Sequence, residues 1–261
     1  MKQLSSTTND IIRETRKIHQ RKYRKESGLF ITEGFHMFQE ACDTQTRIHS
    51  VFVTPQAAAL EPERIAALEG KGCAIYLVND TLLKSVAQTP SPQGIVFVAH
   101  NTIQPYPGTQ ALQGRLVIAL DALQDPGNVG TILRTAWAVG VRSALLGAGC
   151  ADALGEKALR ASMGAIFHMQ LYETQHLPQA LCDAGKAAWH IACAHLKGTD
   201  FFARESHERN ILVVGSEGAG VSEAASAACH GLYTLPMDPG CESLNAAIAA
   251  GIMLYDLWRA P

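Results

Sequence analysis

Short apolar runs alternate with helix-like segments in the first part of the chain. The apolar runs predict strands, which fall at residues 29–31, 48–53, 74–78 and 95–99. The segments between them show the spacing of amphipathic helices, at residues 35–41, 61–68 and 80–86. We therefore expect a compact α/β domain over residues 1–100.

The alternation is interrupted once and then resumes. Residues 101–114 are polar, contain prolines and glycines, and show no periodicity, so they predict a linker between two domains. Further apolar runs predict a second set of strands, at residues 116–120, 144–146, 166–171, 189–194, 211–214 and 232–235. Because helical stretches separate several of these strands, we expect a parallel sheet covered by helices, in a second domain at 115–261.

Composition is that of an ordinary globular protein. Hydrophobic residues make up 47% of the chain and charged residues 18%. No apolar run approaches the roughly 20 residues of a membrane helix, and the N-terminus lacks the apolar stretch of a secretory signal. The 7 cysteines are scattered without a C-x-x-C pair, which argues against a disulfide framework or a zinc site. We therefore expect a cytoplasmic protein with no metal and no membrane partner.

The net charge of −2 conceals a basic N-terminal segment. Residues 12–25 read IRETRKIHQRKYRK, in which cations far outnumber acids. Such a helix is either a solvated face or a surface that gains affinity by releasing counterions from nucleic-acid phosphates. The scarcity of acids favours the second interpretation. The candidate contacts with RNA phosphates are Arg21, Lys22, Arg24 and Lys25.

Three loops of the second domain combine glycine or proline with polar side chains. The first, at 125–130, precedes a helix, so Asn128 lies where backbone N–H groups and the helix dipole favour an anion. The second, GSEGAG at 215–220, follows a buried strand, and the third, MDPGCES at 237–243, leads into the last helix. Because α/β proteins bind ligands beyond the carboxyl ends of strands, we expect the second and third loops to line one pocket, which Asn128 could also approach.

The glycine-rich loops match neither common nucleotide-binding fingerprint. A P-loop needs G-x-x-x-x-G-K-[ST], which is absent from the chain. A dinucleotide site needs G-x-G-x-x-G after the first strand, whereas GSEGAG has another order and comes late, so an NAD enzyme is a weaker alternative. No G-x-S-x-G or H-E-x-x-H motif is present either.

Three separated segments resemble the signatures of the SpoU (TrmH-type) RNA ribose methyltransferases of the SPOUT superfamily. They are DPGNVGTILRTA at 125–136, VVGSEGAGVS at 213–222, and the segment 235–256 with its P-M and S-L-N cores. One departure is that Ala246 and Ala247 follow S-L-N, where the family usually has Val-Ser. The segment 21–41 also resembles the substrate-binding domain fused to many of these enzymes. Together these similarities extend over nearly the whole chain.

The resemblance implies a fold, an activity and partners. The expected fold is a parallel-sheet α/β domain with a deep trefoil knot, joined to a smaller N-terminal α/β domain that binds RNA. The expected activity is S-adenosylmethionine-dependent methylation of a ribose 2′-hydroxyl in structured RNA, by a homodimer. The N-terminal domain favours rRNA over tRNA as the substrate. A tRNA 2′-O-methyltransferase and a non-catalytic RNA-binding protein of the same fold are the alternatives, and the intact signatures argue against the latter.

The resemblance also assigns site residues. It implies cofactor contacts, largely through backbone groups, at Leu196, Gly215, Leu235 and Leu244. It gives Arg134 the central catalytic role and surrounds it with Asn128, Glu217, Ser243 and Asn245. Because arginine is hard to deprotonate in a protein, we interpret Arg134 as a phosphate anchor and alkoxide stabiliser rather than a literal base.

Overall fold

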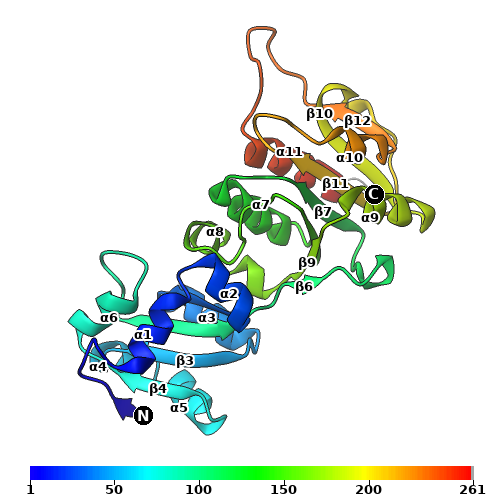
Figure 1. Cartoon of the computed structure of the whole chain (residues 1–261). Helices are drawn as coiled ribbons and strands as arrows, with labels where there is room; N and C mark the ends of the chain where they lie inside the picture. The colour runs from blue at the N-terminus through cyan, green and yellow to red at the C-terminus, as the bar shows by residue number, and fades with distance from the viewer. Residues whose placement is uncertain (260–261) are drawn as a thin grey trace. The chain divides into compact units, whose positions relative to one another are not determined.

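The computed structural model describes residues 1–259, which form two compact units (Figure 1). The first unit contains Met1–Asn101 together with Leu154–Phe167. The second contains Thr102–Ala153 and the chain from His168 onward. The segment Leu154–Phe167 therefore packs with the first unit, although it lies inside the range expected for the second domain.

The first unit is built on a five-stranded mixed sheet with the order β1-β4-β3-β5-β2. Its strands are β1 (Lys2–Gln3), β2 (Leu29–Glu33), β3 (Ile48–Val53), β4 (Ala74–Leu77) and β5 (Ile95–His100). The β3 strand is parallel to β4 and antiparallel to β5. The four strands predicted in this part of the chain are all present, with small shifts at their ends.

Helices cover this sheet, and α3, α5 and α6 among them lie where apolar spacing predicted helices. They are α1 (Asp10–Lys17), α2 (Arg21–Ser27), α3 (Phe35–Asp43), α4 (Pro55–Leu60), α5 (Pro62–Gly70), α6 (Asp80–Val86) and α8 (Glu156–Ser162). Asn79 caps α6 by accepting a hydrogen bond from the Leu82 backbone N–H at 2.8 Å. Ile12 of α1 and Leu83 of α6 are fully buried against Phe52 and Val96 of the sheet, so this face holds part of the core.

Contacts with β2 and α3 hold the segment Leu154–Phe167 in the first unit. The Phe167 ring packs against Phe30 of β2, with 6.2 Å between ring centroids. The His36 imidazole of α3 lies 3.2 Å from the Met163 carbonyl oxygen. Met163 and Gly164 both have positive φ, which ends α8 and turns the chain. A 3₁₀ turn at Ala165–Phe167 follows, so the first half of the strand predicted at 166–171 is wrong.

The second unit contains a seven-stranded sheet in which every described pairing is parallel. The order is β12-β10-β11-β7-β8-β9-β6. The strands are β6 (Gln104–Pro105), β7 (Leu116–Asp121), β8 (Ser143–Gly147), β9 (Gln170–Thr174), β10 (His190–Asp200), β11 (Asn210–Gly215) and β12 (Gly231–Thr234). This confirms the predicted parallel α/β sheet. Within residues 101–114, the β6 strand and a 3₁₀ turn at Thr109–Ala111 stand where only a linker was expected.

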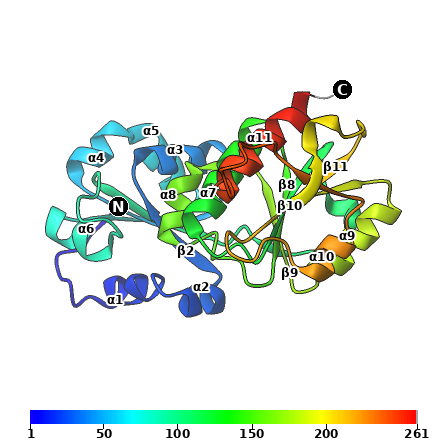
Figure 2. The same ribbon diagram turned by 90° about the horizontal axis from the view of Figure 1, so that it is seen from above.

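Helices on both faces explain why β7, β8 and β11 are buried throughout. The helices are α7 (Pro126–Ala138), α9 (Leu177–Lys186), α10 (Glu223–Ala227) and α11 (Ala246–Arg259). The α7 and α11 helices lie side by side on one face, and α9 and α10 lie on the other (Figures 1 and 2). Val117 and Ala119 belong to the core on the α9 and α10 face, together with Leu181 and Ala225.

The β10 strand departs from regular pairing in its second half. The register of β10 against β12 shifts between Ala194 and Thr199, so the intervening segment leaves the ladder.

The loop between β10 and β11 is fastened to the last helix by an ion pair of 2.6 Å between Arg204 and Asp256. The Arg204 side chain is only 6% exposed and lies over the Phe201 ring, 3.9 Å from its centroid. Among residues 1–259, no helix has the length and apolar character needed to cross a bilayer.

His190 lies in a cluster of aromatic and basic side chains. Its ring stacks on His207 with 3.7 Å between centroids, and His230 lies 5.4 Å away. Its Nε2 is 3.2 Å from the Tyr233 hydroxyl. Burial, followed by the nearby charges of His207, His230 and Arg204, lowers the pKa of His190 to about 4.

This cluster predicts an acid-sensitive contribution to stability. Between about pH 6.5, the pKa of histidine in an unfolded chain, and about pH 4, the unfolded chain binds a proton that folded His190 does not. The free energy of unfolding should therefore fall as pH drops through this window, and His190→Gln should flatten the fall. The measurement is urea unfolding at several pH values. His176→Gln, at an exposed position, is the control and should keep the wild-type slope. An equal slope in His190→Gln and wild type would contradict the prediction.

Candidate active site

A pocket of about 280 Å³ opens in the second unit near the carboxyl ends of β10, β11 and β12. An irregular segment of β10, the turn after β11, the loop after β12 and the helix α11 line it. The loops at 215–220 and 237–243 contribute to the lining as predicted, whereas residues 125–130 do not line the pocket. The lining residues are Ala194–Lys197, Val214, Ser216–Gly220, Tyr233–Leu235, Met237, Ser243, Leu244, Ala246, Ala249 and Met253. The walls are mainly aliphatic, with polar groups concentrated in the loops.

The irregular segment of β10 forms one wall of the pocket. Because the register shift removes this segment from the ladder, His195, Leu196 and Lys197 face the pocket instead of pairing with β12. Gly198 ends the segment where a Cβ atom would collide with the backbone of Leu232 and Tyr233. The bulge and its glycine therefore create the wall that holds Leu196.

A tight turn after β11 forms the opposite wall. The backbone N–H of Ser216 donates to the Gly220 carbonyl at 3.1 Å, and the N–H of Gly220 donates to the Ser216 carbonyl at 2.9 Å. A Cβ atom on Gly215 would overlap the backbone of Gly220 and Val221. Gly220 itself has a φ of +69°. Both glycines of the G-x-E-x-x-G segment are thus required by the turn.

The residues predicted to hold the cofactor lie around this pocket. Leu196, from the irregular segment of β10, and Leu235 and Leu244, from the loop between β12 and α11, line it directly. Gly215 does not line it but supports the turn behind it. Two of the predicted catalytic residues, Glu217 and Ser243, also line the pocket.

A hydrogen-bonded cluster joins one residue from each of the three signature segments. The Asn128 Nδ2 amide donates to the Glu217 carboxylate. The Asn245 Nδ2 amide donates to the Asn128 Oδ1 at 3.2 Å. These residues are far apart in sequence, and only the packing of the second unit brings them into contact.

The two asparagines are held at the beginnings of neighbouring helices. Asp125 caps α7 and accepts a hydrogen bond from the Asn128 backbone N–H at 2.8 Å. The Asn245 Oδ1 accepts hydrogen bonds from the backbone N–H groups of Ala247, at 2.9 Å, and Ile248, at 3.2 Å. Because its oxygen caps α11, the amide nitrogen of Asn245 is directed to Asn128.

Arg134 is not brought into this cluster. It lies on the exposed side of α7, six residues beyond Asn128, a rise of about 9 Å along a helix. It does not line the pocket, and it forms no hydrogen bond or ion pair with any residue from 1 to 259. Within one chain, its guanidinium therefore faces solvent.

The basic N-terminal residues divide into exposed and buried groups. Arg21, Lys22 and Lys25 are exposed on α2. Arg24 is only 8% exposed, and its Nη1 donates to the carbonyl oxygens of Ile18, at 2.9 Å, and His19, at 2.6 Å. These carbonyls follow the end of α1 and need donors. Arg24, which the sequence predicted as an RNA contact, is therefore already engaged in hydrogen bonds within the first unit.

Sequence reasoning missed Asp121, which is buried at the carboxyl end of β7. Its carboxylate accepts a hydrogen bond from the Ser222 backbone N–H at 2.7 Å and so anchors the far end of the glycine-rich turn. The available signal was an acidic residue directly after a buried apolar strand. Within residues 1–259, no group of three or more side chains is arranged to bind a metal ion.

Two family models match the chain. The SpoU rRNA Methylase family matches residues 115–255, and the MRM3-like substrate binding domain matches residues 9–96. The 23S rRNA (guanosine(2553)-2′-O)-methyltransferase RlmP of Bacillus subtilis (strain 168) is 31% identical over 258 residues, covering 98% of this chain and 99% of the relative.

Solved structures share the fold over nearly the whole chain. The AdoMet-bound rRNA methyltransferase from Sinorhizobium meliloti superposes with a TM-score of 0.88 at 27% identity, covering 99% of this chain and 97% of that one. AviRb, a SpoU methyltransferase from Streptomyces viridochromogenes, superposes with a TM-score of 0.83 at 23% identity, covering 96% and 97%. These neighbours confirm the predicted SPOUT architecture. With the family matches, they show that the chain belongs to the SpoU rRNA methylase family.

Proposed function

We propose that this protein transfers a methyl group from S-adenosylmethionine to a ribose 2′-hydroxyl of ribosomal RNA. The observation that carries this proposal is the Asn128–Glu217–Asn245 cluster, which unites the three signature segments at the mouth of an aliphatic pocket. A full-length relative is named as a 23S rRNA 2′-O-methyltransferase, and a structural neighbour binds AdoMet. Both support the proposal.

The pocket suits S-adenosylmethionine, which supplies an activated methyl group when bound. Leu196, Leu235 and Leu244 offer apolar surface for a flat purine ring. The turn at Ser216–Gly220 lets backbone groups approach a ligand closely because glycines flank it. Leu196 is 63% exposed and Leu244 is 37% exposed, so both have surface to lose to a ligand.

The polar cluster is arranged to position a ribose hydroxyl. The Asn128 and Asn245 amides each use one N–H within the cluster and keep a second without a partner among residues 1–259. These donors can bind ribose oxygens, while Glu217 fixes the orientation of Asn128. Positioning matters in methyl transfer because the acceptor oxygen must approach in line with the leaving sulfur. The Arg134 guanidinium anchors a phosphate and stabilises negative charge that develops on the oxygen.

A homodimer is the second part of the proposal. Ile248, Ile252 and Tyr255 are 55%, 40% and 48% exposed, and they follow one another along one face of α11 at helical spacing. Soluble monomers rarely leave such an apolar stripe uncovered. The α7 helix lies beside α11 (Figure 2) and carries the exposed residue Arg134. A second copy packed on this stripe would exclude water near Arg134, which the single chain leaves in solvent.

The cofactor assignment predicts that Gly215→Ala damages S-adenosylmethionine binding. The added methyl group overlaps the Gly220 backbone, so the turn must open, at a cost of about 1–3 kcal/mol in stability. The dissociation constant from isothermal titration calorimetry should rise about tenfold or more, which corresponds to about 1.4 kcal/mol. Gly70→Ala is the control, since it lies outside the pocket and its added Cβ atom would meet nothing within 4 Å, and it should keep wild-type stability and affinity. Unchanged affinity in Gly215→Ala would contradict the assigned pocket.

The activity itself is tested with RNA from a strain that lacks this gene. Wild-type protein should transfer tritiated methyl groups from S-adenosylmethionine to 23S rRNA and not to tRNA, and nucleotide mapping should locate the product on a 2′-oxygen. Arg134→Ala and Arg134→Lys should each lower the turnover number about 100-fold, because a planar guanidinium is needed. Their affinity for S-adenosylmethionine should not change. Arg142→Lys, at another exposed position, is the control. Near-normal turnover by Arg134→Lys with unchanged RNA affinity would exclude a specific guanidinium role.

The dimer is tested by placing a charge in the apolar stripe. Ile252→Asp should sediment as a single chain in analytical ultracentrifugation, whereas the wild type sediments as a dimer, because a carboxylate in an apolar interface is strongly unfavourable. Leu60→Asp is the control, since Leu60 is 70% exposed on α4 in the other unit. That variant should remain dimeric. A wild-type protein that sediments as one chain would refute the homodimer.

A further inference from the structure

A large groove in the first unit is used by none of the functions assigned above. Its volume is about 760 Å³, and it shares no lining residue with the candidate active site. The end of α3, the loop before β3, α5 and residues of the three strands β3, β4 and β5 line it. The lining residues are Cys42, Asp43, Gln45–His49, Arg64, Ala67, Leu68, Lys71–Ala74, Tyr76 and His100.

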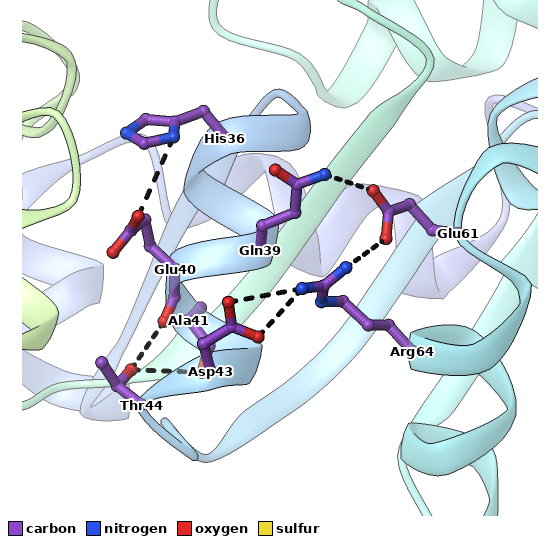
Figure 3. Close-up of polar contacts among 8 residues, drawn as sticks. All are labelled: His36, Gln39, Glu40, Ala41, Asp43, Thr44, Glu61 and Arg64. Atoms are coloured by element: carbon purple, nitrogen blue, oxygen red, sulfur yellow. Dashed lines mark hydrogen bonds and ion pairs between the residues drawn. The ribbon is translucent and has the colours of Figure 1, made fainter.

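The cations of the groove divide into one that is neutralised and two that are available. Arg64 binds Asp43 at 3.0 Å and Glu61 at 2.9 Å, so its guanidinium forms a fixed wall (Figure 3). Asp43, the acid among the lining residues, is held in this ion pair. Arg47 and Lys71 are exposed, and neither side chain bonds to any residue from 1 to 259. The groove therefore presents two unpaired positive charges to a ligand.

The loop that carries Arg47 is held in place before any ligand binds. The Thr44 hydroxyl donates to the carbonyl oxygen of Glu40 at 2.8 Å (Figure 3). It also lies 3.0 Å from the Thr46 hydroxyl. Gln45 adopts a φ of 56°, which side-chain-bearing residues seldom adopt. Such backbone strain persists only where the surrounding structure enforces it. Binding here would order little additional backbone.

Aromatic rings stand beside these cations. The β3–β5 register shifts between Ile48 and Ser50, which places His49 at an irregularity of the sheet. The His49 and His100 rings are 6.0 Å apart and inclined by 62°. Tyr76 also lines the groove and is stacked on Phe52, with 5.1 Å between centroids. Burial, Arg47 and His49, in that order, lower the pKa of His100, which disfavours the protonated form of its imidazole.

This combination fits RNA better than it fits another polyanion. Unpaired cations bind phosphates, while flat neutral rings bind unstacked bases in a way that does not depend on their identity. Sequence-specific and loop-specific RNA recognition relies on such splayed bases. An acidic peptide would satisfy the cations but would offer the imidazole and phenol rings no planar partner.

We propose that this groove is an RNA-binding site, with phosphates on Arg47 and Lys71 and an unstacked nucleobase against His49 and His100. The inference rests on the proposed RNA substrate and extends it. Because the groove and the candidate active site share no residue, the nucleotides held here are not the nucleotide that is methylated. The groove adds to the exposed cations of α2 as a means of selecting a folded RNA.

The test uses the full-length protein and unmodified 23S rRNA transcribed in vitro. Filter binding at several KCl concentrations gives the dissociation constant and its salt dependence. Arg47→Gln/Lys71→Gln should weaken binding about tenfold at 0.15 M salt and make the log–log salt slope shallower by about 1–2, as expected for two lost phosphate contacts. His49→Ala/His100→Ala should weaken binding severalfold and leave the salt slope unchanged.

A charge-matched control separates a specific site from a general loss of positive charge. Lys2→Gln/Lys84→Gln removes two exposed cations that lie outside the groove and form no ion pair within residues 1–259, and it should keep the wild-type affinity within about twofold. Circular dichroism melts show that each variant is folded. Equal weakening in the control, or unchanged affinity and slope in Arg47→Gln/Lys71→Gln, would overturn the proposal.

Methyl transfer distinguishes this inference from the proposed function. At saturating RNA, Arg47→Gln/Lys71→Gln should keep the wild-type turnover number, and only its Michaelis constant for RNA should rise. Its affinity for S-adenosylmethionine should equal that of the wild type. If wild-type protein methylates rRNA while the variant binds and reacts identically, only the groove assignment fails. If the wild type neither binds nor methylates rRNA, both the proposed function and the groove assignment fail.

Discussion

The hydrogen bonds that link Asn128 to Glu217 and Asn245 are the constraint on which the candidate site depends. They connect the start of α7, the turn after β11 and the start of α11. Each partner is also fixed by its own backbone surroundings, through the Asp125 cap, the Ser216–Gly220 turn and the cap of α11. Because the side chains are held before any ligand arrives, the cluster can orient a weak nucleophile at little entropic cost.

The pocket beside this cluster arises where regular structure fails. A purely regular β10 would pair with β12 along its whole length, and Leu196 would then lie in the ladder instead of lining the pocket. The register shift and Gly198 move this segment aside. On the opposite wall, Gly215 allows the chain to fold back on itself. The sheet supplies rigidity, and its two irregularities supply the space.

A cation of the first unit indicates RNA binding only where the fold itself does not use that cation in a hydrogen bond or an ion pair. Arg24 and Arg64 look like RNA contacts by composition, yet one caps α1 and the other is bound between two carboxylates. Arg47 and Lys71 have no such use and converge on a groove with aromatic walls. By the same criterion, Arg134 is an exposed and unengaged cation on α7, beside the apolar stripe of α11. Cations that the fold does not occupy are the ones that can bind phosphate.

The sequence by itself determined the features that depend on local pattern. Apolar runs placed most strands and helices, their separation by helices indicated a parallel sheet, and three short signatures identified the family. The tertiary structure alone decided which distant groups meet. It joined Asn128 to Asn245, buried Arg24, and packed the segment Leu154–Phe167 with the first unit. It also assembled the groove from residues of five elements, α3, β3, α5, β4 and β5. Hydrophobic periodicity encodes which side of an element is buried, but contact between remote polar side chains follows from how the elements pack.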